Sequence, residues 1–324
     1  MVSLSRRRLL VGAGALAAGG VLGSLPFHRS PLQPGALRVW RYKGSAASFI
    51  DLAGQADTPY PLEWVDLSGG NLVLEALNSG SLDYAYMSEI PPIFASIASV
   101  PLVIVARYKA DINDSAIVVR KDAGIHGVAD LRGKKISYVR ATNTHYFVLN
   151  MLRQNGLSLD DVEAVPLPMQ DALTAFRSGH IDALAAGGIS VLQASESGGE
   201  VLENSHRYCT GNYLIATTRR VLDDPQRRSQ VADFLRRERA TWDWVNAHPE
   251  RWAERSETLT GIDRGLYLQQ FRLRSQPARL VAVSESGIAS QQHVADTFYE
   301  NHLIPRPVDV RPLWSGDFSD LLNS

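Results

Sequence analysis

LEALNSGSLD (residues 74–83) is followed 99 positions later by a similar stretch, LTAFRSGHID (residues 173–182). Both stretches predict a helix that ends at a glycine, then a short turn, then a strand that opens near the aspartate. Glycine is favoured at the helix end because it adopts the left-handed backbone conformation without steric cost. The similarity indicates that two parts of the chain share one layout.

The segments around these stretches repeat at nearly the same offset. Strands expected at 37–40 and 65–67 have counterparts at 135–139 and 165–167. The loops after the first strand of each half also align, Arg41-x-x-Gly44-Ser45 with Arg140-x-x-Asn143-Thr144. Strands that alternate with helices are typical of parallel sheets covered by helices on both faces. We therefore predict an α/β fold of two lobes, each with the same strand–loop–helix order.

The composition bounds the function. The 324 residues include 33 basic and 34 acidic side chains, a formal net charge of -1, and 45% are hydrophobic. A folded protein is expected, and a strongly basic nucleic-acid binder is not. Cys209 is the single cysteine of the sequence, which excludes an intrachain disulfide and a multi-cysteine metal site. No histidine pair has metal-ligand spacing either, so we expect no metal and no cofactor.

Residues 1–30 have the layout of an export signal. Ser5-Arg6-Arg7-Arg8 precedes an uncharged stretch at 9–22, which is shorter than the ~20 residues that span a bilayer. Adjacent arginines before an apolar stretch resemble a twin-arginine signal, which predicts a periplasmic protein exported by that route; an uncleaved anchor is the alternative. Without residues 1–30 the chain keeps 29 basic and 34 acidic side chains, so local groups rather than overall charge must attract an anion.

The loops between expected strands and helices hold small or hydrogen-bonding residues. Ligands of open parallel sheets bind outside the carboxyl ends of the strands, near helix N-termini, whose N–H groups favour small anions. Capping and turn formation explain any single loop, but four or five such loops at facing sheet edges indicate a ligand. The candidate ligand-binding residues are Lys43, Gly44, Ser45, Ser68, Gly69, Gly70, Ser88, Glu89, Thr142, Asn143, Thr144, His145, Gly187 and Gly188.

Several motifs occur in a fixed order between about residues 36 and 314. They include RYKGS (41–45), IPP (90–92), VADLRGKK (128–135) and LIP (303–305). This ordered set resembles the periplasmic solute-binding proteins for aliphatic sulfonates and taurine, which are related to nitrate binders. The resemblance implies a type II periplasmic-binding-protein fold, in which two α/β lobes joined by a hinge enclose the ligand in a cleft. It implies a first lobe of 36–123 plus 217–324, an inserted second lobe of 124–216, and hinge crossings near 121–124 and 210–212.

The same resemblance implies a function. The chain is expected to be a monomeric solute-binding protein that captures a small organic anion, an aliphatic sulfonate, and delivers it to an ABC permease in the inner membrane. Two departures stand out. Residues 186–190, Ala-Gly-Gly-Ile-Ser, replace a Trp-Asp-Pro-like motif of many members, so the pocket is expected to be larger or to suit a different ligand tail. Glu89 would pair with Lys43 or Arg107, bind a ligand amine, or be a solvated or helix N-terminal glutamate.

Two alternatives to a transport protein stay open. One is an enzyme on the same fold, resembling a sulfinate desulfinase or a pyrimidine-synthesising enzyme; the other is a ligand-sensing subunit of a membrane receptor. The desulfinase needs a cysteine after the first strand, where this chain has Lys43-Gly44-Ser45. A lone cysteine such as Cys209 is usually a small buried hydrophobe, so we expect no catalytic residue and no enzyme. His145 is expected to cap or pack at a helix start or, alternatively, to contact the ligand.

Overall fold

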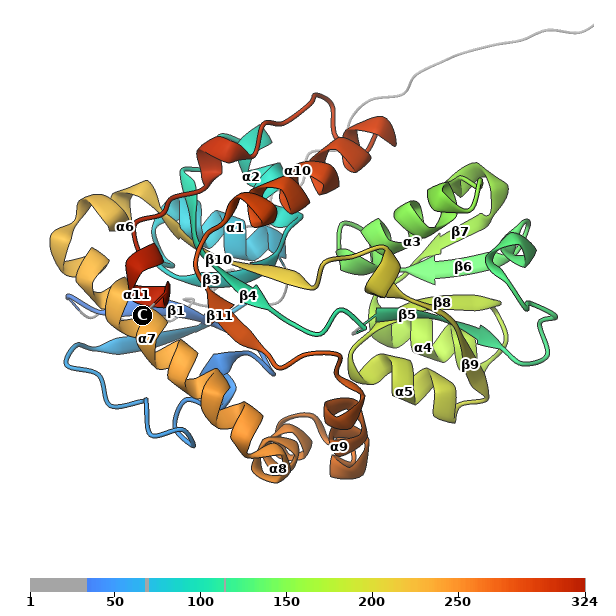
Figure 1. The fold of residues 1–324 in the computed structure, drawn as a ribbon, viewed down its shortest axis with the longest axis horizontal. Coiled ribbons are helices and arrows are strands. Elements are labelled where there is room, and N and C mark those ends of the chain that lie inside the picture. The colour runs from blue at the N-terminus through green and yellow to red at the C-terminus, as the bar shows by residue number, and fades with distance from the viewer. Residues whose placement is uncertain (1–33, 68–69, 114, 324) are drawn as a thin grey trace, which may run out of the picture. The chain divides into compact units, whose positions relative to one another are not determined.

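The computed structural model describes residues 34–67, 70–113 and 115–323 (Figure 1). The predicted export signal at 1–30 and the candidates Ser68 and Gly69 lie outside the described residues. Gly35–Ser324 forms one compact unit, which contains every strand and helix named below.

The first sheet layer is built from both ends of this unit. Its strands are β1 (Leu37–Arg41), β2 (Leu62–Asp66), β3 (Ala85–Ser88), β4 (Leu102–Lys109), β10 (Asn212–Thr218) and β11 (Arg279–Val281). β1 and β2 pair in parallel, and a parallel bridge between Val39 and Tyr84 ties β1 to the start of β3. The remaining strands follow in the order β3-β10-β4-β11, with β10 antiparallel to both of its neighbours.

The second sheet comes from the middle of the chain. Its strands are β5 (Ser115–Arg120), β6 (Lys135–Tyr138), β7 (Glu163–Pro166), β8 (Ala183–Gly187) and β9 (Gly199–Asn204). They follow in the order β7-β6-β8-β5-β9. β6 is parallel to β7 and β8, whereas β5 is antiparallel to β8 and β9.

Helices cover both faces of each sheet (Figure 1). They are α1 (Gly70–Ser79), α2 (Pro91–Ile97), α3 (Asn143–Gln154), α4 (Met169–Arg177), α5 (Ile189–Glu196), α6 (Arg219–Asp223), α7 (Pro225–Ala247), α8 (Pro249–Thr260), α9 (Arg264–Leu273), α10 (Glu285–Glu300) and α11 (Ser319–Asn323). On the first sheet, α7 packs on one face, and α1, α2 and α10 pack on the other. On the second, α3 lies on one face and α4 and α5 on the other. Among the residues described, no helix is both long and apolar enough to cross a membrane.

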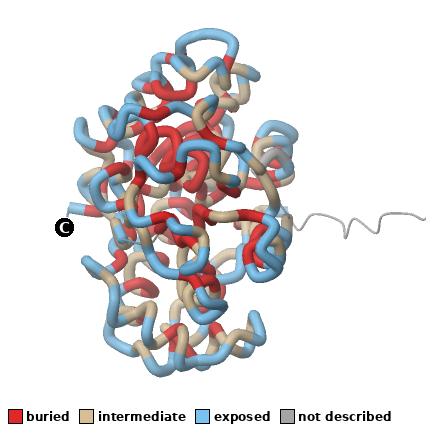
Figure 2. Tube along the Cα trace, turned by 90° about the vertical axis from the view of Figure 1, so that its right-hand side faces the viewer, coloured by how far each residue is buried: buried red, intermediate tan, exposed pale blue. Residues whose placement is uncertain are grey.

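Burial follows from this layering. Leu102–Tyr108 of β4 are all buried because helices cover both faces of the strand. Figure 2 shows buried segments running through the interior, with exposed turns around them. Four clusters of apolar side chains, one for each sheet face, form the core among the described residues.

The predicted repeat is confirmed for the three strands and for the helix before the last of them. The helix expected after the first strand is absent from the first half, where a three-residue 3-10 helix (Ala46–Ser48) follows β1, whereas α3 follows β6. β1, β2, α1 and β3 have the same order and the same parallel pairing as β6, β7, α4 and β8. The glycines that follow the two helices, Gly80 and Gly179, have φ of +78° and +74°. Each also lacks a Cβ where an arginine guanidinium packs, that of Arg220 in the first half and that of Arg120 in the second.

Two strands, β5 and β10, lie in a different sheet from the one predicted for them. We expected 36–123 and 217–324 in the first lobe and 124–216 in the second. However, β5 pairs with β8 and β9, and β10 pairs with β3 and β4. An apolar run such as 116–119 predicts a buried strand without showing which sheet contains it.

The first crossing between the sheets therefore lies between β4 and β5 and includes residues 110–113. The prediction of a crossing near 121–124 is wrong, because this segment is a turn that follows β5 within the second sheet. Gly124, with φ of +65°, marks that turn. The return crossing, between β9 and β10, contains the predicted residues 210–211.

Candidate functional site

The strand directions bring the candidate loops to the same place. β4 runs parallel to β3, since both are antiparallel to β10, so the chain leaves the first sheet at the edge where β1 and β3 end. β5 is antiparallel to β8, so the chain enters the second sheet at the edge where β6 and β8 end. Both crossings therefore join the carboxyl edges of the two sheets, where ligands of α/β folds bind.

The two crossings are tied to each other side by side. The Ala110 N–H donates to the Gly211 carbonyl at 2.9 Å, and the Ser205 hydroxyl donates to the Ile112 carbonyl at 2.8 Å. Gly211 has φ of +67°, and a Cβ there would lie 2.9 Å from the Ala110 carbonyl oxygen. A close backbone approach therefore requires glycine at this point of the hinge.

The loop after β1 uses most of its own donors. The Tyr42 carbonyl accepts from the Ser45 N–H at 3.0 Å, from the Ser45 hydroxyl at 2.7 Å and from the Ser48 hydroxyl at 3.3 Å. The Gly44 N–H donates to the Ser48 hydroxyl at 3.1 Å, and Gly44 has φ of +90°. Gly44 and Ser45 therefore shape a tight turn, and the exposed Lys43 side chain is the group of this candidate set that the turn presents to solvent.

Glu89, which follows Ser88 at the end of β3, is buried at the return crossing. Its carboxylate accepts from the Ser290 hydroxyl at 2.7 Å, from Thr210 at 3.4 Å and from Asn212 at 3.5 Å. Burial raises its pKa to about 7, although these hydrogen bonds and the charge of Arg107 oppose the shift. Of the alternatives predicted for Glu89, the solvated one is wrong, whereas its place before the start of α2 agrees with the helix N-terminal one. Glu89 instead holds α10 and the hinge together.

The loop after β6 leaves the start of α3 without a side-chain cap. The Thr142 hydroxyl donates to the Val139 carbonyl at 2.7 Å, and the Thr144 hydroxyl accepts from the Val139 N–H at 3.1 Å. Thr142 is the N-cap residue of α3, and its side chain makes no capping hydrogen bond. The first-turn N–H groups, which include that of Asn143, point out of the helix end with a partial positive charge.

His145 packs, as one of the two alternatives predicted. Its ring is 2% exposed, stacks on Tyr138 with centroids 4.6 Å apart and meets Phe298 edge-on at 5.5 Å. Its Nδ1 accepts from the Ala141 N–H at 3.2 Å. Burial, with a smaller effect of the Arg140 charge, lowers its pKa to about 4, so the ring is neutral at pH 7.

Arg140 is a further candidate, outside the set predicted from the sequence. Arg41, its counterpart in the repeat, forms an ion pair with Asp66 at 2.6 Å, directly across the β1–β2 register. The β6–β7 register ends at the pair Tyr138–Pro166, and its continuation would place Arg140 opposite Pro168, which is not an acid. Arg140 is exposed and takes part in none of the ion pairs among the described residues. The missing counterpart of Asp66 is a signal that the sequence repeat contains.

Gly187 is the last residue of β8, and Gly188 lies between β8 and α5. Gly188 is the N-cap residue, with φ of +57° and no side chain to cap the helix. Ile189, the next residue, packs against the core cluster of the first sheet. The second sheet therefore adds no large side chain at 186–188.

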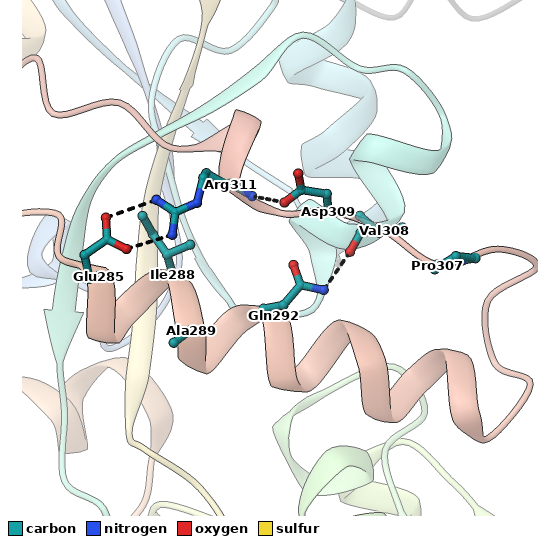
Figure 3. A pocket seen from close by; sticks show the side chains of 8 residues that line it. All are labelled: Glu285, Ile288, Ala289, Gln292, Pro307, Val308, Asp309 and Arg311. Carbon is teal, nitrogen blue, oxygen red and sulfur yellow. Dashed lines mark hydrogen bonds and ion pairs between the residues drawn. The ribbon is translucent and has the colours of Figure 1, made fainter.

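Two surface cavities lie away from these loops. One, of about 640 Å³, runs beside α10, where Glu285 and Arg311 form an ion pair at 2.7 Å (Figure 3). The other, of about 710 Å³, is lined by Arg38, Gly80, Arg220, Asp223, Asp224 and Arg227. Neither cavity is lined by a predicted ligand-binding residue.

Cys209 is half-buried at the return crossing. Burial, together with the nearby charge of Glu89, raises the pKa of its thiol to about 12. A nucleophilic cysteine needs the opposite shift, because the thiolate is the reactive form. Cys209 is therefore unsuited to nucleophilic chemistry in this environment.

Comparison with known proteins supports this architecture. A family model described as NMT1/THI5 like matches residues 62–252. A chain named as an aliphatic sulfonates-binding protein of Escherichia coli K12 is 32% identical, with 91% of this chain and 94% of the relative covered. The crystal structure of the periplasmic aliphatic sulphonate binding protein SsuA from Escherichia coli superposes with a TM-score of 0.76 at 28% identity, covering 86% of this chain and 91% of that chain.

A second solved relative is the alkanesulfonate-binding protein SsuA from Xanthomonas axonopodis pv. citri bound to MOPS. It superposes with a TM-score of 0.77 at 25% identity and covers 88% of this chain and 99% of its own. The desulfurization enzyme DSZB shares the fold alone, with a TM-score of 0.64 at 16% identity and coverage of 89% and 98%. The chain therefore belongs to the NMT1/THI5-like family and, within it, groups with the aliphatic sulfonate-binding proteins.

Proposed function

We propose that this protein is an extracytoplasmic solute-binding protein that captures a sulfonate and delivers it to an ABC permease. Family membership and the names of its relatives support this function. The convergence of loops at the carboxyl edges of both sheets supports the location of the ligand. Cys209, the single cysteine of the sequence, has a pKa raised to about 12 by burial, which disfavours a desulfinase-like activity.

The observation that carries the proposal is Arg140 beside the uncapped start of α3. Arg140 and the N-terminus of α3 are both positive. Among the described residues, no carboxylate forms an ion pair with Arg140, and no side chain caps the helix. An anion would bind there without having to displace an existing partner. A guanidinium donates two parallel hydrogen bonds to an oxyanion, and the Asn143 amide and Lys43 across the crossings would add further donors.

The candidates divide by role in this proposal. Lys43, Asn143 and Arg140 would contact the sulfonate, together with Ser88 and the N–H groups at Gly70 and Gly188. Gly44, Ser45, Thr142 and Thr144 would shape the loops, as their internal hydrogen bonds indicate. Glu89 and His145 would position the hinge and α3 rather than touch the ligand.

We also propose the cellular setting and the lobe limits. The relatives named as periplasmic and the arginine pair at Arg6-Arg7 support export to the periplasm by the twin-arginine route. Sheet membership supports a first lobe of 36–110 plus 212–323 and a second lobe of 115–205. A monomer would present both lobes to the permease.

Arg140→Ala tests the proposal, and Arg41→Ala is its matched control. Arg41 holds the equivalent position in the repeat but is neutralised by Asp66. Losing a charge-assisted contact costs about 1.5–3 kcal/mol, or at least tenfold in Kd. Isothermal titration with butanesulfonate and benzenesulfonate should show this loss for Arg140→Ala and less than about a twofold change for Arg41→Ala. Equal affinity of both variants and the wild type would place the anion elsewhere.

A further inference from the structure

Tyr42 presents an exposed aromatic ring beside the proposed anion site. Its side chain is 56% exposed, although tyrosine buries a large apolar area when it packs in a protein. Tyr42 directly follows β1 and precedes Lys43, so the ring and the ammonium group leave the same sheet edge. Leu72, in the first turn of α1 after β2, is 39% exposed. Two large apolar groups therefore lie exposed at this edge.

The turn fixes the backbone that carries the ring. The Tyr42 carbonyl accepts three hydrogen bonds, two from Ser45 and one from Ser48. A ring on an anchored backbone loses little conformational freedom when a ligand packs on it, because just two side-chain torsions remain to be fixed. The exposed ring is therefore a pre-organised surface.

Trp40 supports the ring from the side of the sheet. The centroids of Trp40 and Tyr42 are 5.6 Å apart, and their planes are inclined by 41°. The Trp40 indole N–H donates to the Leu67 carbonyl at 3.2 Å, which holds the indole in place. Tyr42 thus contacts Trp40 and still leaves more than half of its surface exposed to solvent.

The loop after β8 in the second sheet consists of small residues. Gly187 and Gly188 lie there, and the residue before them, Ala186, is buried. No large side chain of residues 186–188 would compete for the face of Tyr42. The aromatic surface therefore comes from the first lobe, and residues 186–188 of the second lobe add no large side chain beside it.

We propose that the Tyr42 ring is the surface on which the organic tail of the ligand packs, and that it selects sulfonates with a planar aromatic ring over open-chain sulfonates. This inference rests on the proposed function. An aromatic tail stacks offset on tyrosine and gains attraction beyond the burial of its area, whereas an alkyl chain gains the burial alone. The sulfonate group would then meet Lys43 and Arg140.

The test compares benzenesulfonate with butanesulfonate by isothermal titration on the mature chain. Tyr42→Ala should weaken benzenesulfonate binding by about three- to tenfold and butanesulfonate binding by less than about twofold. Tyr42→Phe should retain the wild-type preference because it keeps the ring. Tyr299→Ala is the matched control, since Tyr299 is 43% exposed on α10 and lies in no candidate loop.

The outcomes separate this inference from the proposed function. Wild-type protein that binds butanesulfonate as tightly as benzenesulfonate, or Tyr42→Ala that weakens both equally, overturns the role of Tyr42 and leaves the proposed function standing. Wild-type protein that binds neither compound overturns both. Thermal unfolding of Tyr42→Ala without ligand should show a loss of no more than about 1 kcal/mol, because the ring is more than half exposed and packs on Trp40 alone among the aromatic rings of the described residues.

Discussion

Glu89 and His145 are both buried near the hinge, and burial shifts their pKa values in opposite directions. It raises the pKa of the Glu89 carboxyl to about 7 and lowers that of the His145 imidazole to about 4. In both cases the low-dielectric surroundings disfavour the charged form. Each group therefore makes the stability of the fold depend on pH, in a window set by its own pKa.

Glu89→Gln should reduce the loss of stability that the wild type shows as pH rises from about 4.5 to 7. Between about pH 4.5 and pH 7 the unfolded chain releases a proton that folded Glu89 keeps, so its contribution is complete below pH 4.5 and is lost as pH rises through 7. Denaturant unfolding measures this effect. Between pH 5 and pH 8 the free energy of unfolding of the variant should fall by about 1–3 kcal/mol less than that of the wild type. The variant should keep part of the dependence of stability on pH, because Glu238 is also buried and its pKa is also raised to about 7.

Glu75→Gln is the control for that experiment, because Glu75 is exposed on α1. It should follow the wild-type profile. A Glu89→Gln variant with the same pH slope as the wild type would show that Glu89 is hydrated in solution.

His145→Asn should act at the acid end. Folded His145 stays neutral while the unfolded residue takes up a proton below about pH 6.5, so stability is lost as pH falls from 6.5 toward 4. Asparagine can still accept from the Ala141 N–H without titrating. Its free energy of unfolding should fall by about 1–2 kcal/mol less than that of the wild type between pH 7 and pH 5. Identical acid sensitivity of the two proteins would contradict the burial of a neutral ring.

At the scale of single elements, the sequence predicted much of the fold because its signals are local. Helix ends at Gly80 and Gly179 and the strand–loop–helix order of both halves need no knowledge of distant residues. Which sheet receives β5 depends on its antiparallel partners β8 and β9, which an apolar run does not specify. The burial of Glu89 likewise depends on Ser290, which lies 201 positions away in the chain.

The candidate loops were also predictable from local sequence signals. The hydrogen bonds that their side chains make were not. The sequence indicates hydroxyls and glycines after each strand. It does not show that the Ser45 hydroxyl is committed to the Tyr42 carbonyl at 2.7 Å. The repeat aligns Arg140 with Arg41, but the two strand registers are needed to show that Arg41 has an acid opposite it and Arg140 does not.

Gly211→Ala and Gly124→Ala test which segment is the hinge. Both glycines have nearly the same φ, +67° and +65°, but a Cβ at Gly211 would lie 2.9 Å from the Ala110 carbonyl oxygen, whereas a Cβ at Gly124 would meet nothing within 4 Å. Backbone strain alone costs about 1 kcal/mol. Gly124→Ala should lose about that much free energy of unfolding, and Gly211→Ala clearly more. Equal losses would contradict the close approach of the two crossings.

At the scale of the whole unit, the two lobes share one layout and touch on both sides of the crossings. Tyr146 and Leu149 of α3 pack in the cluster that holds α10, and α5 contacts α9. A guanidinium nitrogen of Arg153 on α3 lies 3.9 Å from a carboxylate oxygen of Glu300 on α10. α3, whose start would hold the anion, is therefore in contact with the first lobe. A ligand at that start would favour whichever lobe arrangement gives it the most contacts.

The most direct test of the proposed function is thermal and denaturant unfolding of the mature chain with a panel of alkane- and arenesulfonates, with sulfate and nitrate as reference anions. A ligand at about one hundred times its Kd raises the free energy of unfolding by about 2.7 kcal/mol. We predict such stabilisation by at least one sulfonate, its loss in Arg140→Ala and its retention in Arg41→Ala. A panel in which no sulfonate stabilises the protein would contradict the proposed function.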